Sequence, residues 1–305
     1  MGYGLTCGVH TRIDETVAQV VRTGHAGNLY VNRNVVGAVV GVQPFGGEGL
    51  SGTGPKAGGP LHVLRLLSQA PAGAARAAVC AAVCAAGARA APPVRGLEVD
   101  RHHSDSVDAD NTAALQALQR WATAQGLSDV AQACVACAKQ ALTTVWRALR
   151  GSTGEANLYA VRPRAAVLCL APAAAAGDTL RLMQLAAVLA VGSRAVWPVT
   201  ARALWDRLGA ELREHITLAQ NWQAPTVASF DAVLHSGPQT DRLQVLLVLA
   251  QRSGPFVGVT VFAPAVPGLT MARLVTERSL SINTAAAGCN ASQMTLGQSG
   301  RPLLH

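Results

Sequence analysis

The sequence predicts an α/β protein whose C-terminal part is a doubly wound, mostly parallel sheet. From residue 157 onward, short apolar runs alternate with helical patterns. Strands separated by helices of about ten to fifteen residues are typical of a parallel sheet with crossover helices. Half of the 305 residues are hydrophobic and 14% are charged, so the chain can bury an extensive core and is not a disordered polymer.

The elements of this alternating pattern follow one another closely. The run at 165–170 is continuously apolar, as expected of a strand buried on both faces. Asp178 is a candidate N-cap for the helix that follows, and Gly192 is a candidate for its C-terminal stop. We predict strands at 157–161, 165–170, 195–199, 226–234 and 256–262, and helices at 178–192, 201–215 and 241–252.

Changes of composition divide the chain into parts. Residues 1–67 are rich in Gly, Asn and β-branched residues. Residues 68–95 consist almost entirely of Ala, Pro, Arg and Cys, and form either a helix ended by Pro92 and Pro93 or a semi-flexible connector. The stretches LQALQRWATAQ and VAQACVACAKQALTTVWRALR have helical spacing and predict helices within 109–150. We therefore expect a first part at 1–67, a connector at 68–108 and a domain at 109–305.

The formal net charge of +8 and the isoelectric point of about 9.6 raise the question of nucleic-acid binding. The arginines are isolated, without dense runs or interleaved aromatic residues, so a solvated basic surface is the better interpretation. The N-terminus does not resemble a signal peptide, and Pro and Gly interrupt the longest apolar stretches, which argues against a membrane span. Seven cysteines, an odd number, do not predict a disulfide framework. We expect a cytoplasmic protein without nucleic-acid partners or a transmembrane segment.

Cysteine and histidine pairs are the candidate metal ligands. Cys80 with Cys84, and Cys134 with Cys137, have spacings that could bind zinc, but cysteines in Ala-rich helices usually act as small buried hydrophobes. The histidines at 102–103 lie among acidic residues, as in a solvated loop before a helix. The segment at 151–154 lacks the lysine and the spacing of a phosphate-binding loop. We predict no metal site and assign no cofactor-binding residues.

The most informative stretch is GNLYVNRNVVGAVVGVQPFGGEGLSGTGPKAGG, at residues 27–59. Its strand LYV is followed by a loop from Gly37 to Gly41, whose small residues expose backbone N–H groups. The run QPFGG then places one aromatic ring, Phe45, among residues of little bulk. So many glycines indicate a backbone that turns sharply or approaches another group closely. The glycines alone would be interpreted as a structural loop.

The order of these residues resembles the C-terminal signature of the aldehyde dehydrogenase family, in which an Asn-containing strand leads to a PFGG turn and an SG-x-G tail. With the preceding YGLTCGVHTRIDE, it is similar to the glutamate-γ-semialdehyde (1-pyrroline-5-carboxylate) dehydrogenase branch, and above all to the bifunctional proline-utilization proteins. The resemblance covers residues 2–67 nearly without gaps. It implies the C-terminal piece of an aldehyde dehydrogenase catalytic domain, followed by an aldehyde-dehydrogenase-like doubly wound α/β domain without catalytic residues.

The resemblance also implies a substrate site. Backbone N–H groups at Gly37 and Ala38 would bind the carboxylate of the semialdehyde, because peptide N–H donors suit an anion. Phe45 would line the aldehyde tunnel, and Gly46 and Gly47 would let the loop pass close to it. In this family a thiolate attacks the aldehyde, hydride passes to NAD⁺, and the thioester is hydrolysed to glutamate.

The family's catalytic cysteine and most of its NAD⁺ site would lie upstream of this chain, as would the FAD-binding proline dehydrogenase part. We therefore assign no catalytic residue, interpret Cys7 as a buried structural thiol, and expect a truncated or frameshifted chain that is inactive alone. An alternative is a non-catalytic assembly or lid module of the same protein, which forms a homo-oligomer through its C-terminal domain.

Two further expectations concern folding. LSINTAAAGCNAS at 280–292 echoes LYVNRNVVGAVVG at 29–41, a weak internal repeat that suggests two related folds in tandem. Residues 1–67 are expected to fold poorly alone, because their strands would lack neighbours, and 157–300 to fold independently.

Overall fold

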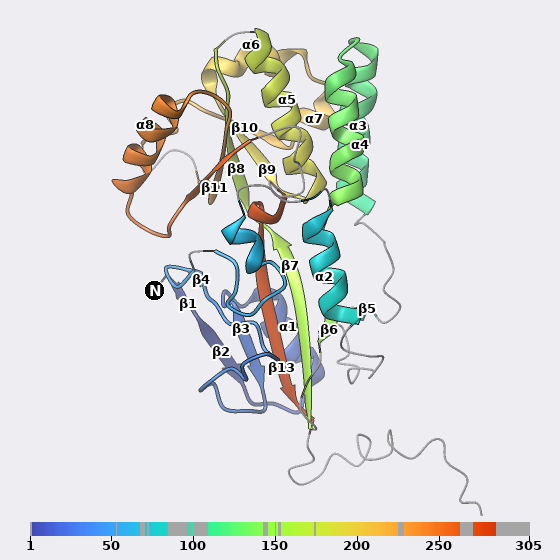
Figure 1. Ribbon diagram of the computed structural model, residues 1–305, viewed down its shortest axis with the longest axis vertical. Coiled ribbons are helices and arrows are strands. Elements are labelled where there is room, and N and C mark those ends of the chain that lie inside the picture. Colours follow the sequence, from blue (N-terminus) through green and yellow to red (C-terminus); the bar gives the residue numbers. More distant parts are fainter. Residues whose placement is uncertain are drawn as a thin grey trace, which may run out of the picture.

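The computed structural model describes residues 2–52, 54–67, 71, 73–84, 97, 99–100, 109–142, 146–149, 151, 154–173, 175–224, 229–262 and 271–284. Two sheets occupy opposite ends of an elongated molecule (Figure 1). A five-stranded sheet with most of the helices forms one end. A six-stranded sheet, whose members come from both halves of the sequence, forms the other.

The five-stranded sheet confirms the predicted doubly wound α/β fold. Every neighbouring pair of its strands is parallel, and the order is β10-β9-β8-β11-β12. The direction of winding therefore reverses between β8 and β11, as in doubly wound sheets. The strands are β8 (Ala166–Leu170), β9 (Arg194–Pro198), β10 (Ile216–Ala219), β11 (Ala232–His235) and β12 (Gly258–Val261).

The helices of this end differ from the prediction in one place. α5 (Ala175–Ala190) and α8 (Gln239–Ala250) lie close to the predicted ranges. The helix predicted at 201–215 is instead divided into η2 (Val199–Ala201), α6 (Arg202–Arg207) and α7 (Ala210–Arg213). Leu208 and Gly209 between them have extended backbones, and glycine is a poor residue for continuing a helix.

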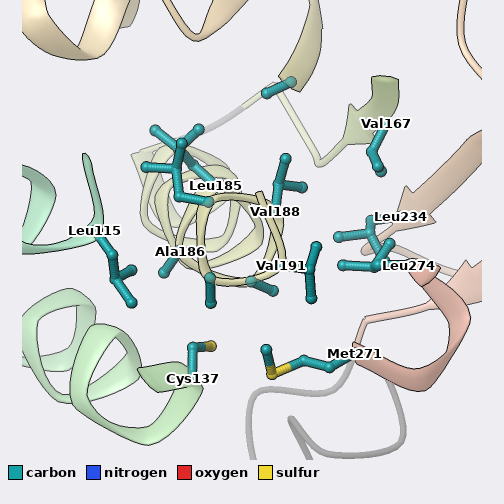
Figure 2. Packing of buried hydrophobic residues seen from close by; sticks show 14 of the residues in the cluster. Leu115, Cys137, Val167, Leu185, Ala186, Val188, Val191, Leu234, Met271 and Leu274 are labelled. Carbon is teal, nitrogen blue, oxygen red and sulfur yellow. The ribbon is translucent and has the colours of Figure 1, made fainter. Parts of the chain in front are cut away.

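A helical hairpin packs against α5 on the outside. It consists of α3 (Ala109–Ala124) and α4 (Ser128–Gln140). Leu118 and Val130 are fully buried in its interior. Figure 2 shows Leu115 and Cys137 pointing from the hairpin side toward Ala186 of α5, with Met271 close by. Small side chains at this contact let the helices approach closely, as the alanine content suggests.

The helical prediction for the end of 109–150 is wrong. Residues Trp146–Leu149 form a strand, β6, that pairs with β7 (Glu155–Pro163) in antiparallel orientation. The tertiary partner decides the outcome, because the short segment WRAL suits either a helix or a strand and β7 offers an edge with which it can pair. α2 (Ala74–Cys84) follows η1 (Val63–Leu66) in sequence and packs against β6.

The six-stranded sheet joins distant parts of the sequence. Its order is β2-β3-β13-β7-β6-β5, with β2 (Thr6–Val9), β3 (Asn28–Val31), β13 (Val275–Asn283) and β5 (Val99–Asp100). β13 pairs with β7 along its whole length and with β3 on its other side. β1 (Tyr3–Gly4) and β4 (Glu48–Gly49) form a small separate pair.

This pairing bears on the expected folding units. All strands of the five-stranded sheet come from 166–261, so this sheet is complete within 157–300. The antiparallel pair of β7 and β13 is not complete within 157–300, because β13 also pairs with β3. The division at 67 and 108 stays a prediction, although the six-stranded sheet contains strands from all three predicted parts.

The two faces of the six-stranded sheet have different chemistry. On one face, apolar side chains pack against α1 (Asp14–Thr23) through Val17 and Val21. The strand residues in this cluster include Leu29, Val31, Leu158, Leu280 and Ile282. Because side chains alternate along a strand, the intervening residues face the other way, and most of them are polar. The glycine-rich segment covers that polar face. Among the described residues, no helix is long and apolar enough to cross a membrane.

Candidate substrate-anchoring site

The polar face of the sheet is organised in cross-strand rows. Tyr30, Ser281 and Asn157 are direct neighbours in one row across β3, β13 and β7. Asn28, Ser279 and Tyr159 form the next row. Neighbouring side chains in such rows are close enough to share hydrogen-bond partners. Residues 43–59 lie over these rows and supply the partners.

The loop at 37–43 is closed by its own backbone and by one buried side chain. Gly37 and Gly41 have φ of +74° and +80°, values that side chains with a Cβ rarely adopt. The amides of Val42 and Gln43 both donate to the Val39 carbonyl oxygen. The Gln43 side chain is buried, and its Oε1 accepts a hydrogen bond of 3.1 Å from the Val39 amide.

Gln43 connects this loop to the antiparallel strands β7 and β13. Its Nε2 lies 3.0 Å from Glu155 Oε2, 3.0 Å from Asn157 Oδ1 and 3.1 Å from Ser281 Oγ. Two amide hydrogens are shared among these three acceptors. The carboxamide is therefore fixed at both ends, by the loop on one side and by β7 and β13 on the other.

Arg33 makes a second connection to the same two strands. Its Nη1 donates to Glu155 Oε1 at 2.6 Å and to Ser281 Oγ at 2.8 Å, and its guanidinium lies over the Tyr30 ring. Its Nη2 donates to the Gly37 carbonyl oxygen at 3.5 Å. This charged donor is largely buried, so it is screened less than a surface pair.

Together, Arg33 and Gln43 orient both peptide groups that flank Ala38. The Gly37 carbonyl, which Arg33 contacts, belongs to the same planar unit as the Ala38 amide. The Val39 amide, which Gln43 contacts, belongs to the unit that follows. A planar trans peptide points its N–H away from its carbonyl, so holding the Gly37 oxygen sets the direction of the Ala38 N–H.

The Phe45 turn is held from three sides. Phe45 and Ala57 exchange two backbone hydrogen bonds, of 3.0 and 2.8 Å. Ser279 Oγ donates to the Pro44 carbonyl oxygen at 2.7 Å. The Gly46 carbonyl oxygen accepts from Lys56 Nζ at 2.6 Å and from Asn28 Nδ2 at 3.1 Å. The backbone on both sides of the aromatic ring is therefore fixed.

One ion pair and one buried carboxylate join the segment to β13. Glu48 forms a bidentate pair with Arg278, at 2.6 and 2.9 Å, and Arg278 also donates to the Val21 carbonyl at the end of α1. Glu277 accepts from the Lys56 amide at 2.7 Å and from the Tyr159 hydroxyl at 2.6 Å. Burial raises the pKa of Glu277, against the opposing effect of these hydrogen bonds and of Lys56.

A small pocket opens in the same polar face. It has room for about one water molecule and is lined in part by Tyr30, Gln43, Asn157 and Ser281.

The structure brings the three predicted site residues onto one continuous segment. Gly37 is exposed, while Ala38 and Phe45 are half-buried. Gln43, Glu155 and Lys56 were missed, because their partners lie more than a hundred residues away in the sequence. The alternation of polar residues in EANLY and RSLSIN was a usable signal of a strand with one polar face.

The cysteines whose side chains the structure describes give no sign of a nucleophile or a metal site. Cys7 is half-buried, not fully buried as predicted, and it packs at the edge of the apolar cluster beside α1. Burial raises the pKa of Cys134, Cys137 and Cys169 to about 12, so these thiols are unreactive at neutral pH. Within the part of the chain that the structure describes, no group of three potential metal ligands occurs. The histidines at 102–103, which were interpreted as part of a solvated loop, lie outside those residues.

The turn after β8 does not fit a dinucleotide, although it occupies the usual place for one. Gly177 is packed so tightly that a Cβ would overlap the Pro172 carbonyl oxygen, so its role is to let the turn close onto α5. Asp178 lies in the first turn of α5 and pairs with Arg181 at 3.3 Å. A carboxylate in the first turn of this helix would repel a pyrophosphate at its N-terminus.

Comparison with known proteins agrees with this geometry. Residues 1–69 match the model of the aldehyde dehydrogenase family. The chain is 47% identical over 306 residues to the bifunctional protein PutA of Escherichia coli (strain K12), which covers 97% of this chain and 21% of that protein. It is 36% identical over 303 residues to the PutA of Rhizobium meliloti, covering 97% of this chain and 22% of that protein.

A separate enzyme matches the glycine-rich part alone. The 1-pyrroline-5-carboxylate dehydrogenase 1 of Halalkalibacterium halodurans is 57% identical over 61 residues, which is 20% of this chain and 12% of that protein. Among solved structures, that of Proline Utilization A from Corynebacterium freiburgense superposes with a TM-score of 0.50 at 19% identity, covering 93% of this chain and 23% of that chain. This likeness supports the fold.

The two sheets and the glycine-rich loop thus define a protein with aldehyde-dehydrogenase-like α/β domains. Over nearly its whole length, the chain corresponds to the C-terminal portion of the PutA proteins that it matches. It spans about a fifth of the length of the curated PutA proteins that it matches.

Proposed function

We propose that this chain supplies the substrate-anchoring part of an NAD-dependent L-glutamate-γ-semialdehyde dehydrogenase, which oxidises the semialdehyde to glutamate in proline catabolism. One observation carries the proposal: Arg33 contacts the carbonyl oxygen of the Gly37–Ala38 peptide, which bears the Ala38 N–H, and Gln43 holds the N–H of the peptide that follows. A preorganised N–H donor such as that of Ala38 binds a carboxylate without reorganising when it arrives.

The roles of the site residues follow from this arrangement. The N–H groups of Gly37 and Ala38 bind the carboxylate end of the semialdehyde. The Phe45 ring, on a turn that is fixed on both sides, lines the path of the aldehyde end. Holding both ends of a small substrate aligns the carbonyl carbon for attack, which raises the rate by lowering the entropic barrier.

We assign the chemical step to residues that this chain does not contain. We place the thiol nucleophile and the NAD site in the portion of the relatives that this chain does not span, and FAD in the proline dehydrogenase portion. The β8–α5 turn does not fit a dinucleotide, so no step of the reaction is derived through this sheet. The isolated chain is expected to be inactive, and cytoplasmic residence stays a prediction.

The alternative, an assembly or lid module, is favoured by a different observation. β13 inserts between β3 and β7, and its Ser281 contacts Gln43 of the anchoring loop from the polar face of the sheet. The two functions are compatible, because the strands that complete this sheet also hold the loop. Oligomerisation through the C-terminal domain stays a prediction.

A chimera tests the proposal. The matching 306-residue region of the E. coli PutA is replaced by this chain, and formation of NADH from glutamate-γ-semialdehyde is followed. We expect the chimera to oxidise the semialdehyde and the isolated chain to give no NADH above background. A folded chimera that stays at background, while the unmodified E. coli protein is active, would refute the proposed function.

A further inference from the structure

Lys56 is one of two lysines in the sequence and is almost completely buried, with 2% of its surface exposed. Its Nζ donates to the Gly46 carbonyl oxygen at 2.6 Å and to Asn28 Oδ1 at 2.9 Å. A buried ammonium group is costly to desolvate, so its presence calls for a specific role.

The position of the ammonium group indicates that role. The Gly46 carbonyl and the Gly47 amide belong to one planar peptide, directly after Phe45. Lys56 therefore fixes the orientation of the peptide that follows the aromatic ring, and Asn28 Nδ2 supports the same oxygen at 3.1 Å. A charged donor makes a bond roughly twice as strong as a neutral one.

We propose that Lys56 is a positioning residue for the Phe45–Gly47 turn, and that its positive charge keeps this turn in the geometry that the aldehyde end of the substrate requires. The inference rests on the proposed function for its link to the aldehyde. The holding of the turn itself is a property of this chain.

The charges around Lys56 come from several elements. Glu277 on β13 is its counter-charge, and the carboxylate also binds the Lys56 amide. Glu48 on β4 is a second negative charge near Lys56, and it is already paired with Arg278 of β13. Tyr159 on β7 contacts Glu277 through its hydroxyl.

Burial lowers the pKa of Lys56 to about 8, while Glu277 and Glu48 act to raise it. The charge of Lys56 therefore changes close to physiological pH. A neutral amine keeps N–H donors but gives weaker bonds to Gly46 and Asn28. The turn should thus become looser as the pH rises through this value.

Lysine-selective NMR of the full 305-residue chain tests the holding of the turn. Two side-chain signals are expected, and the Lys139→Met variant assigns one of them to the exposed Lys139. We expect the Lys56 signal and the Gly47 amide to titrate together near pH 8. In Lys56→Met the Gly47 amide should no longer titrate.

Glu277→Gln is the sharper variant. A glutamine can still accept from the Lys56 amide and donate to the Tyr159 oxygen, so the hydrogen bonds can persist while the counter-charge is lost. The midpoint of the coupled titration should fall by about one pH unit. A Gly47 amide that does not follow Lys56 in the parent, or a midpoint unmoved in Glu277→Gln, would overturn the inference.

The chimera measures the consequence for the aldehyde. In Lys56→Met, kcat should fall by about tenfold for the semialdehyde and for an uncharged short aldehyde alike, because the turn serves the reacting end of both. In Glu277→Gln the alkaline loss of kcat should begin at lower pH, while Lys139→Met should match the parent. Unchanged kcat in Lys56→Met would overturn the inference, whereas an inactive parent chimera would refute the proposed function and leave the NMR result to decide on the turn.

Discussion

At the scale of single residues, the anchoring site depends on side chains that act on backbone groups. Arg33, Gln43 and Lys56 each bind a carbonyl or an amide of the glycine-rich segment, and none is itself an anchoring group. Side chains take this supporting role because the segment itself is rich in glycine. A backbone with so little side-chain packing of its own needs external contacts to stay in one conformation.

The contact between Gln43 and Glu155 gives a first prediction. In Gln43→Glu two carboxylates would face each other, and in Glu155→Gln one amide hydrogen would face a donor. Each single variant should lower the free energy of unfolding by about 1–3 kcal/mol. The double variant restores a donor opposite an acceptor, so it should recover most of the loss. Urea unfolding of the four chains measures the coupling, and purely additive losses would contradict the assigned contact.

The stability effect of Lys56 should depend on pH. Its folded-state pKa is lowered to about 8 from 10.5, so the unfolded chain binds more protons between these values. Losing the charge removes a desolvation penalty that is larger than the loss of hydrogen-bond strength in the turn, so the free energy of unfolding should rise with pH in this window, by up to about 1.4 kcal/mol per unit. Urea unfolding of the parent and of Lys56→Met across this window gives the difference. A parent that loses stability relative to Lys56→Met on this alkaline side would contradict the assignment.

At the scale of secondary structure, β13 is the central element. It is bonded on both edges, and its Leu280 is fully buried against the cluster beside α1. Leu280→Ala should lower the free energy of unfolding by about 2–5 kcal/mol through the cavity that it leaves. Leu247→Ala, on the exposed side of α8, is the matched control and should change it by less than about 0.5 kcal/mol. Equal effects in the two variants would rule out this central role for β13.

Sequence patterns predicted most strands and helices of the five-stranded sheet but missed the long-range strand pairing of the six-stranded sheet. Local alternation predicted β8, β9, β11 and β12 and the helices α5 and α8, but it missed β10 and could not predict that β11 pairs with β8, which lies far from it in sequence. The pairing of β3 with β13 joins residues 28–31 to 279–282, and no local pattern specifies such a register. For the same reason the glycine loop was predicted, but Glu155 and Ser281 behind it were not.

At the scale of the whole molecule, the two sheets should differ in their dependence on residues 1–67. A chain of residues 68–305 retains every strand of the five-stranded sheet and loses β2 and β3 of the other. Amide exchange should remain slow in β8, β9 and β11 and become fast in β13 and β7. Full protection of β13 in the shortened chain would contradict this dependence and would support the prediction that 157–300 folds independently.

The central claim is that the amide at Ala38 anchors a carboxylate, and substrate discrimination tests it most directly. In the chimera, Ala38→Pro removes this N–H, while Ala38→Gly keeps it and serves as the control. We predict that Ala38→Pro lowers kcat/KM for glutamate-γ-semialdehyde by at least about tenfold and leaves that for an uncharged short aldehyde within about twofold. Ala38→Gly should behave as the parent. An Ala38→Pro chimera that handles both aldehydes as the parent does, or loses both equally while its unfolding midpoint is unchanged, would contradict the account.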